Sequence, residues 1–428
     1  MKEDFLYYLW KFQKFETKQL KTTQGETVVV SSVGSHNTQA AGPDFFNALV
    51  SIQGQKWAGT IEIHVKSSDW FVHQHQNDTN YDNVILHVVW EHDIEVFRSN
   101  NTSIPTLQLK DYVSVSALKK YKDLYANAGN KWINCENQIK EVPKFILENW
   151  LERIYFERLS DKSIPVNNLL KECKNNWEAV CFITLAKAFG GNSNGVAFSK
   201  IAHSIPFGVV QKATTSFELE ALFFGQANLL ISHQEDPYYI SLKKEYEYLK
   251  HKFKLTQQAG LQVQFFKLRP SNFPTIRLSQ LAAFYSSVKN VFSAIFNCND
   301  IDAYEKLFDV AAAEYWKTHY TFGKISKKSS KKITRIFVEL LLINAILPLK
   351  FAYENSLQKF DAISSHLALL RGLKPEKNRI SQHYKEFGFP VENALDSQAL
   401  LTLKKSYCDQ HKCVNCAIGF HLLNASKP

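Results

Sequence analysis

The sequence contains few of the residues that mark disordered or fibrous proteins. Of 428 residues, 16 are glycine and 12 are proline. These low counts argue against long disordered segments and collagen-like repeats. Apolar residues make up 45% of the chain, which is enough for two or three hydrophobic cores, because single domains usually contain about 100–200 residues. We therefore expect a globular protein with more than one domain.

Long apolar runs and an export signal are also missing. The longest apolar run, 340–349, is interrupted by Asn344 and Pro348 and is far shorter than the roughly 20 residues that a membrane span needs. The first residues show no basic region followed by an apolar stretch, so no signal peptide is predicted. The seven cysteines, an odd number, do not fit a disulfide framework. The expected location is a reducing cytoplasm.

Positive charge is in excess, since 51 basic residues against 41 acidic ones give a net charge of +10. This balance suits a polyanionic partner such as nucleic acid, and it equally fits an ordinary basic cytoplasmic protein. The densest run of cations precedes an apolar segment and is a candidate contact for a phosphate backbone, with a solvated helix start as the alternative. Its members are Lys324, Lys327, Lys328, Lys331, Lys332 and Arg335.

The first third of the chain has the sequence pattern of an α+β domain. Residues 3–15 predict a short helix, and short β-branched or aromatic segments bounded by turn residues predict strands. The predicted strands are 27–30, 46–52, 60–66, 83–90 and 106–110. We expect an α+β domain with a mixed sheet at 1–120, followed by a linker at 121–142.

Beyond residue 143 the apolar residues recur at helical spacing, as in Leu147, Trp150, Leu151 and Ile154. The predicted helices are 177–189, 217–232, 238–254, 277–296, 301–319, 333–352 and 396–407, with Gly- and Asn-rich loops such as 190–195 between them. We expect a larger all-α region at 143–428 that ends in a cysteine-rich segment.

Candidate catalytic residues are concentrated in 34–93. Alternate residues of a strand share one face, so Glu62, His64 and Lys66 are expected to project together. Asp44 opens the preceding strand, and a hairpin would bring it beside Glu62. Two converging carboxylates form an oxygen site suited to Mg²⁺ or Mn²⁺, and a neighbouring cation would then position a phosphate.

A second cluster of candidate ligands follows directly. His73, His75 and Asp78 lie within six residues and can converge on a metal ion. Together with His87 they would form the centre of a zinc hydrolase that acts on a small substrate. The alternatives are a solvated loop for the first three and an ordinary core histidine for His87.

The Asp44–Glu62 arrangement resembles the PD-(D/E)XK nuclease core. Pro43-Asp44 matches its first element, and Glu62 follows after 17 intervening residues. The resemblance implies metal-dependent hydrolysis of phosphodiester bonds in nucleic acid, with His64 or Lys66 orienting water or offsetting phosphate charge. Because His64 stands where the family has lysine, the alternative is a non-catalytic nucleic-acid-binding or scaffold protein with a degenerate nuclease fold.

Almost the whole chain also resembles an uncharacterised bacterial family, domain-of-unknown-function family 2851. This resemblance implies no activity, so function has to be argued from the site. The segments that carry it are Glu3-Asp4-Phe5-Leu6, Gly42-Pro43-Asp44-Phe45, Glu62-Ile63-His64, Ser68-Asp69-Trp70, His73-Gln74-His75, Val84-Ile85-Leu86-His87-Val88-Val89, Arg269-Pro270-Ser271-Asn272-Phe273-Pro274 and the cysteine-rich end.

Three thiols, Cys408, Cys413 and Cys416, lie within nine residues near the end of the chain. Such density favours zinc or an iron–sulfur cluster, with His411 or Cys135 as candidate fourth ligand. One cysteine after a nuclease-like core and three at the end of the chain resemble the split arrangement of RecB-like nucleases, which implies one four-iron site formed by all four cysteines. The alternative is a hydrophobic cap of reduced thiols.

Overall fold

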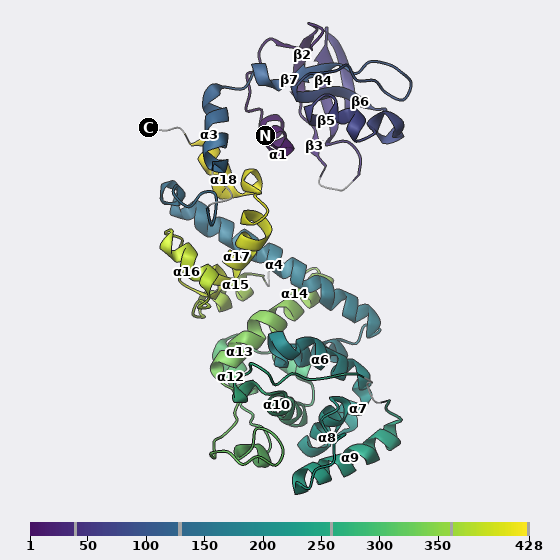
Figure 1. Ribbon diagram of the computed structural model, residues 1–428, viewed down its shortest axis with the longest axis vertical. Helices are drawn as coiled ribbons and strands as arrows, with labels where there is room; N and C mark the ends of the chain where they lie inside the picture. The colour runs from purple at the N-terminus through teal and green to yellow at the C-terminus, as the bar shows by residue number, and fades with distance from the viewer. Residues whose placement is uncertain (38–40, 127–130, 257–259, 360–362, 426–428) are drawn as a thin grey trace. The chain divides into compact units, whose positions relative to one another are not determined.

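The computed structural model describes residues 1–428 except 38–40, 127–130, 257–259, 360–362 and 426–428 (Figure 1). Internal packing divides the chain into two units. The first unit contains 1–150, 379–390 and 400–428, and the second contains 151–378 and 391–399. The first holds a mixed sheet and the second is helical, which confirms the expected order of an α+β part and a mostly helical part.

The boundaries of the units differ from those that the sequence suggested. The cysteine-rich segment was expected to end the helical region, but residues 400–428 belong to the first unit. There the C-terminal helix α18 (Ala417–Asn424) packs against α3 (Val115–Tyr125). The only sign of this in the sequence is the expected site shared by Cys135 and the three C-terminal cysteines, because contacts between residues so far apart depend on packing rather than on local pattern.

A seven-stranded mixed sheet forms the centre of the first unit. The strand order is β1-β2-β4-β5-β6-β7, and β3 pairs with β4 outside this path. Pairs among the first four strands of the path are antiparallel, whereas β5–β6 and β6–β7 are parallel. The strands are β1 (Leu20–Lys21), β2 (Thr27–Ser32), β3 (Ser35–His36), β4 (Phe45–Ile52), β5 (Gln55–Lys66), β6 (Val84–Glu91) and β7 (Thr106–Gln108).

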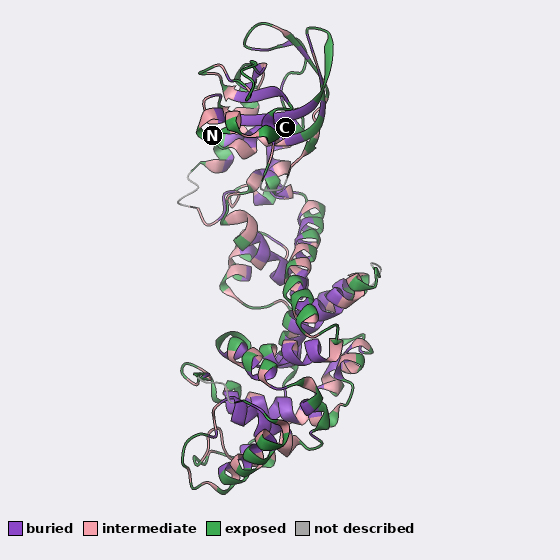
Figure 2. Ribbon diagram, turned by 90° about the vertical axis from the view of Figure 1, so that its right-hand side faces the viewer, coloured by how far each residue is buried: buried purple, intermediate pink, exposed green. Residues whose placement is uncertain are grey.

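The two central strands are buried on both faces. In β5 the side chains 61–64 are buried, and in β6 those of 84–89 are buried, as expected for a parallel pair covered on both sides. Figure 2 shows these buried residues running through the ribbons of the sheet. Helix α1 (Glu3–Lys11) packs against β5. Polar side chains on β5 are therefore held in a nearly dry environment.

The connection from β5 to β6 contains three short turns of helix: α2 (Asp69–Val72), η1 (His75–Asn77) and η2 (Thr79–Tyr81). A buried apolar cluster that includes Trp70 and Tyr81 holds this connection in place. The Trp70 indole also donates a hydrogen bond of 3.2 Å to the carbonyl of Phe97. The histidines of this segment are thus fixed against the sheet.

The second unit consists of helices. Its predicted helix at 177–189 forms with the same bounds as α5. The α-helices that lie wholly or mainly in this unit are α4 (Lys144–Glu172), α5 (Trp177–Phe189), α6 (Gly191–Ser204), α7 (Phe207–Lys212), α8 (Ser216–Gln226), α9 (Pro237–Phe253), α10 (Pro274–Ser287), α11 (Val291–Phe296), α12 (Ile301–Leu307), α13 (Arg335–Leu341), α14 (Leu347–Ser356), α15 (Ile363–Arg371) and α17 (Ala394–Thr402).

Two local predictions for this unit were wrong. The loop predicted at 190–195 is the start of α6, because the buried Asn194 side chain bonds the backbone of Gln264 at both its N–H and its carbonyl. The helix predicted at 301–319 ends at Leu307, and Ala312 instead donates its N–H to the carbonyl of Lys331. In both places a partner distant in sequence overrides the local pattern.

One stretch, 335–356, is long and apolar enough to cross a membrane by length and composition. It comprises α13, a π-helical turn and α14, and its most apolar window of 18 residues has a mean hydropathy of 1.8. Within the fold, 72% of its most apolar window is buried. A helix in a protein core passes the same test, so this stretch is weak evidence for a membrane span.

We expect Gly225→Ala to destabilise the helical unit by about 1–3 kcal/mol. Gly225 in α8 contacts the Tyr246 ring of α9 so closely that a methyl group would overlap the ring. Gly208→Ala in α7 is the matched control, because no atom lies within 4 Å of the added methyl and the change should gain up to about 1 kcal/mol. Thermal unfolding of both variants tests this, and equal midpoints would contradict it.

Candidate metal centre

Asp44 and Glu62 meet through the backbone of the β4–β5 hairpin. The Asp44 N–H donates to Glu62 Oε2 over 3.1 Å, and the Ile63 N–H donates to Asp44 Oδ2 over 2.9 Å. The last regular pair of the β4–β5 ladder is Phe45 with Ile61, so these two bonds continue the pairing directly beyond its end. Each carboxylate thus uses one oxygen to bond the opposite strand.

The two carboxylates have little positive charge around them. Burial raises the pKa of Asp44 to about 8, and the nearby Glu62 carboxylate adds to this rise. Burial likewise raises the pKa of Glu62 to about 8, although the hydrogen bond from Asp44 opposes it. The Tyr7 hydroxyl of α1 is hydrogen-bonded to Asp44, and its own pKa is raised, mainly by burial, so it stays protonated and donates. A cation would remove this electrostatic penalty.

Three imidazoles lie next to Glu62. Ligand nitrogens of His64, His73 and His75 all lie within 4.8 Å of one another. Glu62 Oε1, the oxygen not bonded to Asp44, is 3.5 Å from His64 Nε2 and 3.2 Å from His75 Nε2. The three nitrogens thus form one cluster, and Glu62 Oε1 lies beside two of its members, His64 and His75, which together is a donor set for a transition-metal ion.

His75 carries a further sign of a missing ligand. Its Nε2 is buried, and among the described residues it has no partner with hydrogen-bond geometry, despite its short distance to Glu62. Buried nitrogens without a partner are rare because desolvation then goes uncompensated. A metal ion bound by the converging donors would satisfy this nitrogen.

His87 supports the centre from behind. It is fully buried on β6, and its Nε2 lies 2.9 Å from Nδ1 of His64. Burial lowers the pKa of His64 to about 2 and that of His87 to about 3, with repulsion from neighbouring imidazoles adding to both shifts. Both rings are therefore neutral, which is the form that binds metals. In the tautomer in which Nδ1 of His64 donates to His87, Nε2 of His64 keeps its lone pair on the side of His73, whose Nδ1 lies 3.1 Å away.

Aromatic side chains fix the orientation of the His75 ring. Tyr81 stacks on it with 3.8 Å between ring centroids, and Trp70 meets it edge-on at 5.3 Å. His73, in contrast, is exposed. The centre is thus rigid on its inner side and accessible to solvent at His73.

Two of the candidate residues, Lys66 and Asp78, make contacts outside the cluster of Glu62 and the three histidines. Lys66 is exposed at the end of β5, about 13 Å along the strand from Glu62 by strand geometry, and its positive charge acts on Asp93. Asp78 accepts a hydrogen bond of 2.9 Å from the Asn80 N–H and so caps the turn η2. The charge of Asp78 acts on His75, but neither Lys66 nor Asp78 belongs to the cluster of Glu62 with the three histidines.

The cationic run is divided by its own contacts. Lys331 is buried, and its ammonium donates to backbone carbonyls, so it is not available to a phosphate. Lys332 pairs with Asp309 at 2.9 Å, and Arg335 pairs with Glu305 at 3.1 Å. Three members of the run, Lys324, Lys327 and Lys328, are exposed and form no ion pair within the described part of the chain.

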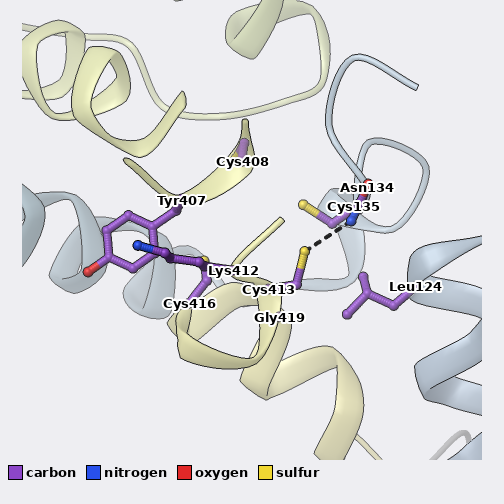
Figure 3. Close-up of a pocket in the computed structure, with 9 residues that line it drawn as sticks. All are labelled: Leu124, Asn134, Cys135, Tyr407, Cys408, Lys412, Cys413, Cys416 and Gly419. Atoms are coloured by element: carbon purple, nitrogen blue, oxygen red, sulfur yellow. Dashed lines mark hydrogen bonds between the residues drawn. The ribbon is translucent and has the colours of Figure 1, made fainter. Parts of the chain in front are cut away.

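The four candidate cysteines come together in the first unit. Cys135, Cys408, Cys413 and Cys416 line one cavity of about 20 Å³ (Figure 3). No disulfide links any cysteine in the described part of the chain. His411, the other candidate fourth ligand, is not among the residues that line this cavity. The geometry therefore favours Cys135 over His411.

Sequence reasoning missed Tyr7 and Tyr81. Tyr7 donates to Asp44, and Tyr81 holds His75. Tyr7 follows Glu3 by one helical turn, and both are half-buried polar residues on a mostly apolar helix. The spacing of Glu3 and Tyr7 was the one feature that could have pointed to Tyr7 as a site residue. Its relevance depends on the packing of α1 against β5, which the sequence does not show.

Comparison with known proteins gives one match. The model of the family DUF2851, described as a protein of unknown function, matches residues 3–379. This range includes the sheet, the histidine cluster and Cys135. Searches of curated proteins and of solved structures gave no match.

We expect the metal-free protein to lose stability as the pH rises from 6.5 to about 8. A carboxyl whose pKa is raised by folding binds its proton more tightly in the folded state, so the free energy of unfolding falls between the unfolded pKa, about 4, and the folded pKa, about 8. His64 and His87 act in the opposite direction but only below about pH 6.5, because their folded pKa values are lowered.

Asp44→Asn should flatten this loss, because the amide removes one buried acid while still accepting from Ile63. The measurement is thermal unfolding with a chelator at pH 6.5 and 8.5. Asp78→Asn, whose side chain can still cap η2, is the control and should keep the wild-type slope. A wild-type slope in Asp44→Asn would show that the carboxylate pair does not carry the effect.

Proposed function

Because the chain belongs to the DUF2851 family, whose description names no activity, we propose from the site alone that the protein is a metal-dependent hydrolase of phosphodiester bonds in nucleic acid. The observation that carries the proposal is the convergence of Glu62 Oε1 with ligand nitrogens of His64, His73 and His75. Convergent donors with an accessible side are typical of catalytic rather than purely structural metal sites.

The donor set favours Zn²⁺ or Mn²⁺ over Mg²⁺. Magnesium prefers an octahedral shell of oxygens, whereas imidazole nitrogens suit zinc and other transition metals. The sequence suggested an oxygen site made by Asp44 and Glu62 with Mg²⁺ or Mn²⁺. The three nitrogens beside Glu62 change that preference.

In this proposal each residue has a separate role. Glu62, His64, His73 and His75 would hold the ion. Because four protein donors fill a tetrahedral shell, a water of lowered pKa would need a fifth position on the ion. Asp44 lies next to Glu62 and is held by Tyr7 and by the Ile63 N–H. A cation bound at Glu62 would lower the raised pKa of the Asp44 carboxyl, and the ionised carboxylate would then accept the proton of an attacking water.

Two features support nucleic acid as the substrate. The net charge of +10 favours a polyanionic partner. The pair Pro43-Asp44 and Glu62 lies on adjoining strands of one hairpin, as the resemblance to the PD-(D/E)XK nuclease core implies. The cytoplasmic location expected from the sequence remains a prediction.

The proposal predicts cleavage of DNA or RNA that requires Mn²⁺ or Zn²⁺. Glu62→Gln and His75→Ala should each lower the rate roughly 100-fold or more, because the several kcal/mol that the ion supplies are lost with it. Lys66→Ala and Asp78→Asn are controls that should retain activity, since neither side chain lies in the converging set. Rates are measured on single- and double-stranded DNA and RNA, with metal content measured in parallel.

The outcome separates the alternatives. Stoichiometric metal without cleavage of any nucleic acid would contradict nuclease activity. Hydrolysis of a small phosphodiester such as bis(p-nitrophenyl) phosphate, but of no polynucleotide, would support the zinc hydrolase of small substrates. Full activity in Glu62→Gln would exclude this centre as the active site.

A second candidate is a nucleic-acid-binding protein without catalysis. The observation that favours it is the position of Lys66, which is exposed and interacts with Asp93 rather than with the carboxylate pair. A nuclease site of the resembled type would need a cation beside those carboxylates. This candidate predicts salt-sensitive binding with no turnover.

If nucleic acid binds the cationic run, neutralising Lys327 and Lys328 together should reduce the salt dependence of affinity. Each lost phosphate contact lowers the slope of log K against log salt concentration by about 0.9, so the pair should lower it by about 1.8. Lys332→Gln is the control, because Lys332 already pairs with Asp309. Binding titrations at several salt concentrations test this, and an unchanged slope in the double variant would contradict it.

A further inference from the structure

Four cysteines surround one cavity in the first unit (Figure 3). Cys135 follows α3, and Cys408, Cys413 and Cys416 lie near the C-terminus, so Cys135 and Cys408 are 273 positions apart in sequence. We propose that these four cysteines bind a [4Fe–4S] cluster that ties the C-terminal segment to the sheet-containing unit. The proposal is independent of the metal centre at Glu62.

The four thiols are largely enclosed, and the positive charges of Lys404 near Cys408 and Lys2 near Cys413 only partly offset the effect of this burial. Burial raises the pKa of Cys135 well above its ordinary value, and the other three cysteines raise it further. Burial also raises the pKa of Cys408 to about 12 and that of Cys416 to about 11. Ionising four thiols in one cavity is costly, because the resulting thiolates repel one another. A bound metal offsets this cost, since it binds the sulfurs as thiolates.

Hydrogen-bond donors are already aimed at the sulfurs. Asn134 Nδ2 donates to Cys413 Sγ over 3.2 Å, and the Tyr384 hydroxyl shares a hydrogen bond of 3.3 Å with Cys408 Sγ. Cys416 precedes α18, and backbone N–H groups at the start of this helix counteract part of the rise in its pKa. A neutral thiol is a weak acceptor, whereas metal-bound thiolates are typically surrounded by such donors.

The spacing of the sulfurs favours a cluster over a single ion. A tetrahedral zinc ion bonds each sulfur at about 2.3 Å, which places the sulfurs about 3.8 Å apart. Among the described residues, the ligand nitrogens of the three histidines all lie within 4.8 Å of one another. No three sulfurs of these four cysteines lie that close together. The thiols thus line the cavity without closing to the spacing of one zinc. In a cubane cluster each thiolate binds a different iron at one corner, so the four sulfurs lie farther apart than they do around one zinc ion.

The backbone around the cavity is shaped to present the thiols. Cys408 is the last residue of a π-helical turn, Leu403–Cys408, and such turns often occur at functional sites. Gly419 of α18 approaches the Cys413 carbonyl so closely that a Cβ would overlap it. The loop between Cys413 and Cys416 is therefore packed tightly against α18, and the cavity exists before any ligand binds.

We expect protein purified without oxygen to be brown, with absorbance near 400 nm and about four iron and four sulfide ions per chain. Cys135→Ser should lose most of its iron. Cys173→Ser is the matched control, because Cys173 is a half-buried cysteine outside the cavity, and it should retain all of it. One zinc per chain without iron, no metal at all, or full iron in Cys135→Ser would each overturn the proposal.

Tyr384→Phe provides a test that does not depend on removing a ligand. The variant keeps all four cysteines but loses the hydroxyl bonded to Cys408, so it should retain four iron ions and have a more negative reduction potential, because a donor to a cluster thiolate is removed. An unchanged potential would overturn the assignment of Cys408 as a ligand. Glu62→Gln should leave the iron content unchanged, which separates this proposal from the hydrolase.

Discussion

The exchange of hydrogen bonds between Asp44 and β5 is the constraint on which the rest of the site depends. Each carboxylate bonds a backbone N–H of the facing segment, at 3.1 Å for Glu62 and 2.9 Å for Asp44, directly beyond the last pair of the β4–β5 ladder. The bonds hold the hairpin and direct Glu62 Oε1 toward His64 and His75. They also bury two acids side by side, which raises the pKa of both carboxyls, and a nearby cation would offset this cost.

The three imidazoles near Glu62 come from two parts of the chain, strand β5 and the connection from β5 to β6. His64 comes from β5 itself and is backed by His87 on the parallel neighbour β6. His73 and His75 come from the connection between these strands, which the buried Trp70 cluster fixes. A parallel pair and its crossover therefore bring three imidazoles together beside one carboxylate, and the site follows from topology as much as from motif.

What the sequence predicted well was local. Period-two alternation identified Glu62 and His64 as neighbours on one face, and the strand and hairpin pattern brought Asp44 beside Glu62. What it missed depends on distant partners. Asp78 is used as a cap, Lys66 lies past the site, and Lys331 is buried by its own carbonyl contacts. Solvent exposure and partner choice at these residues are set by packing, which spacing along one chain does not encode.

The most direct test of the account is the position of a bound ion. Crystals grown with Zn²⁺ and measured at the zinc absorption edge would locate the metal by its anomalous signal. The account predicts a peak about 2.0–2.2 Å from Glu62 Oε1 and from one nitrogen each of His64, His73 and His75. No peak among these four side chains in zinc-saturated protein, or an ion held by Asp44 and Glu62 without the imidazoles, would contradict it.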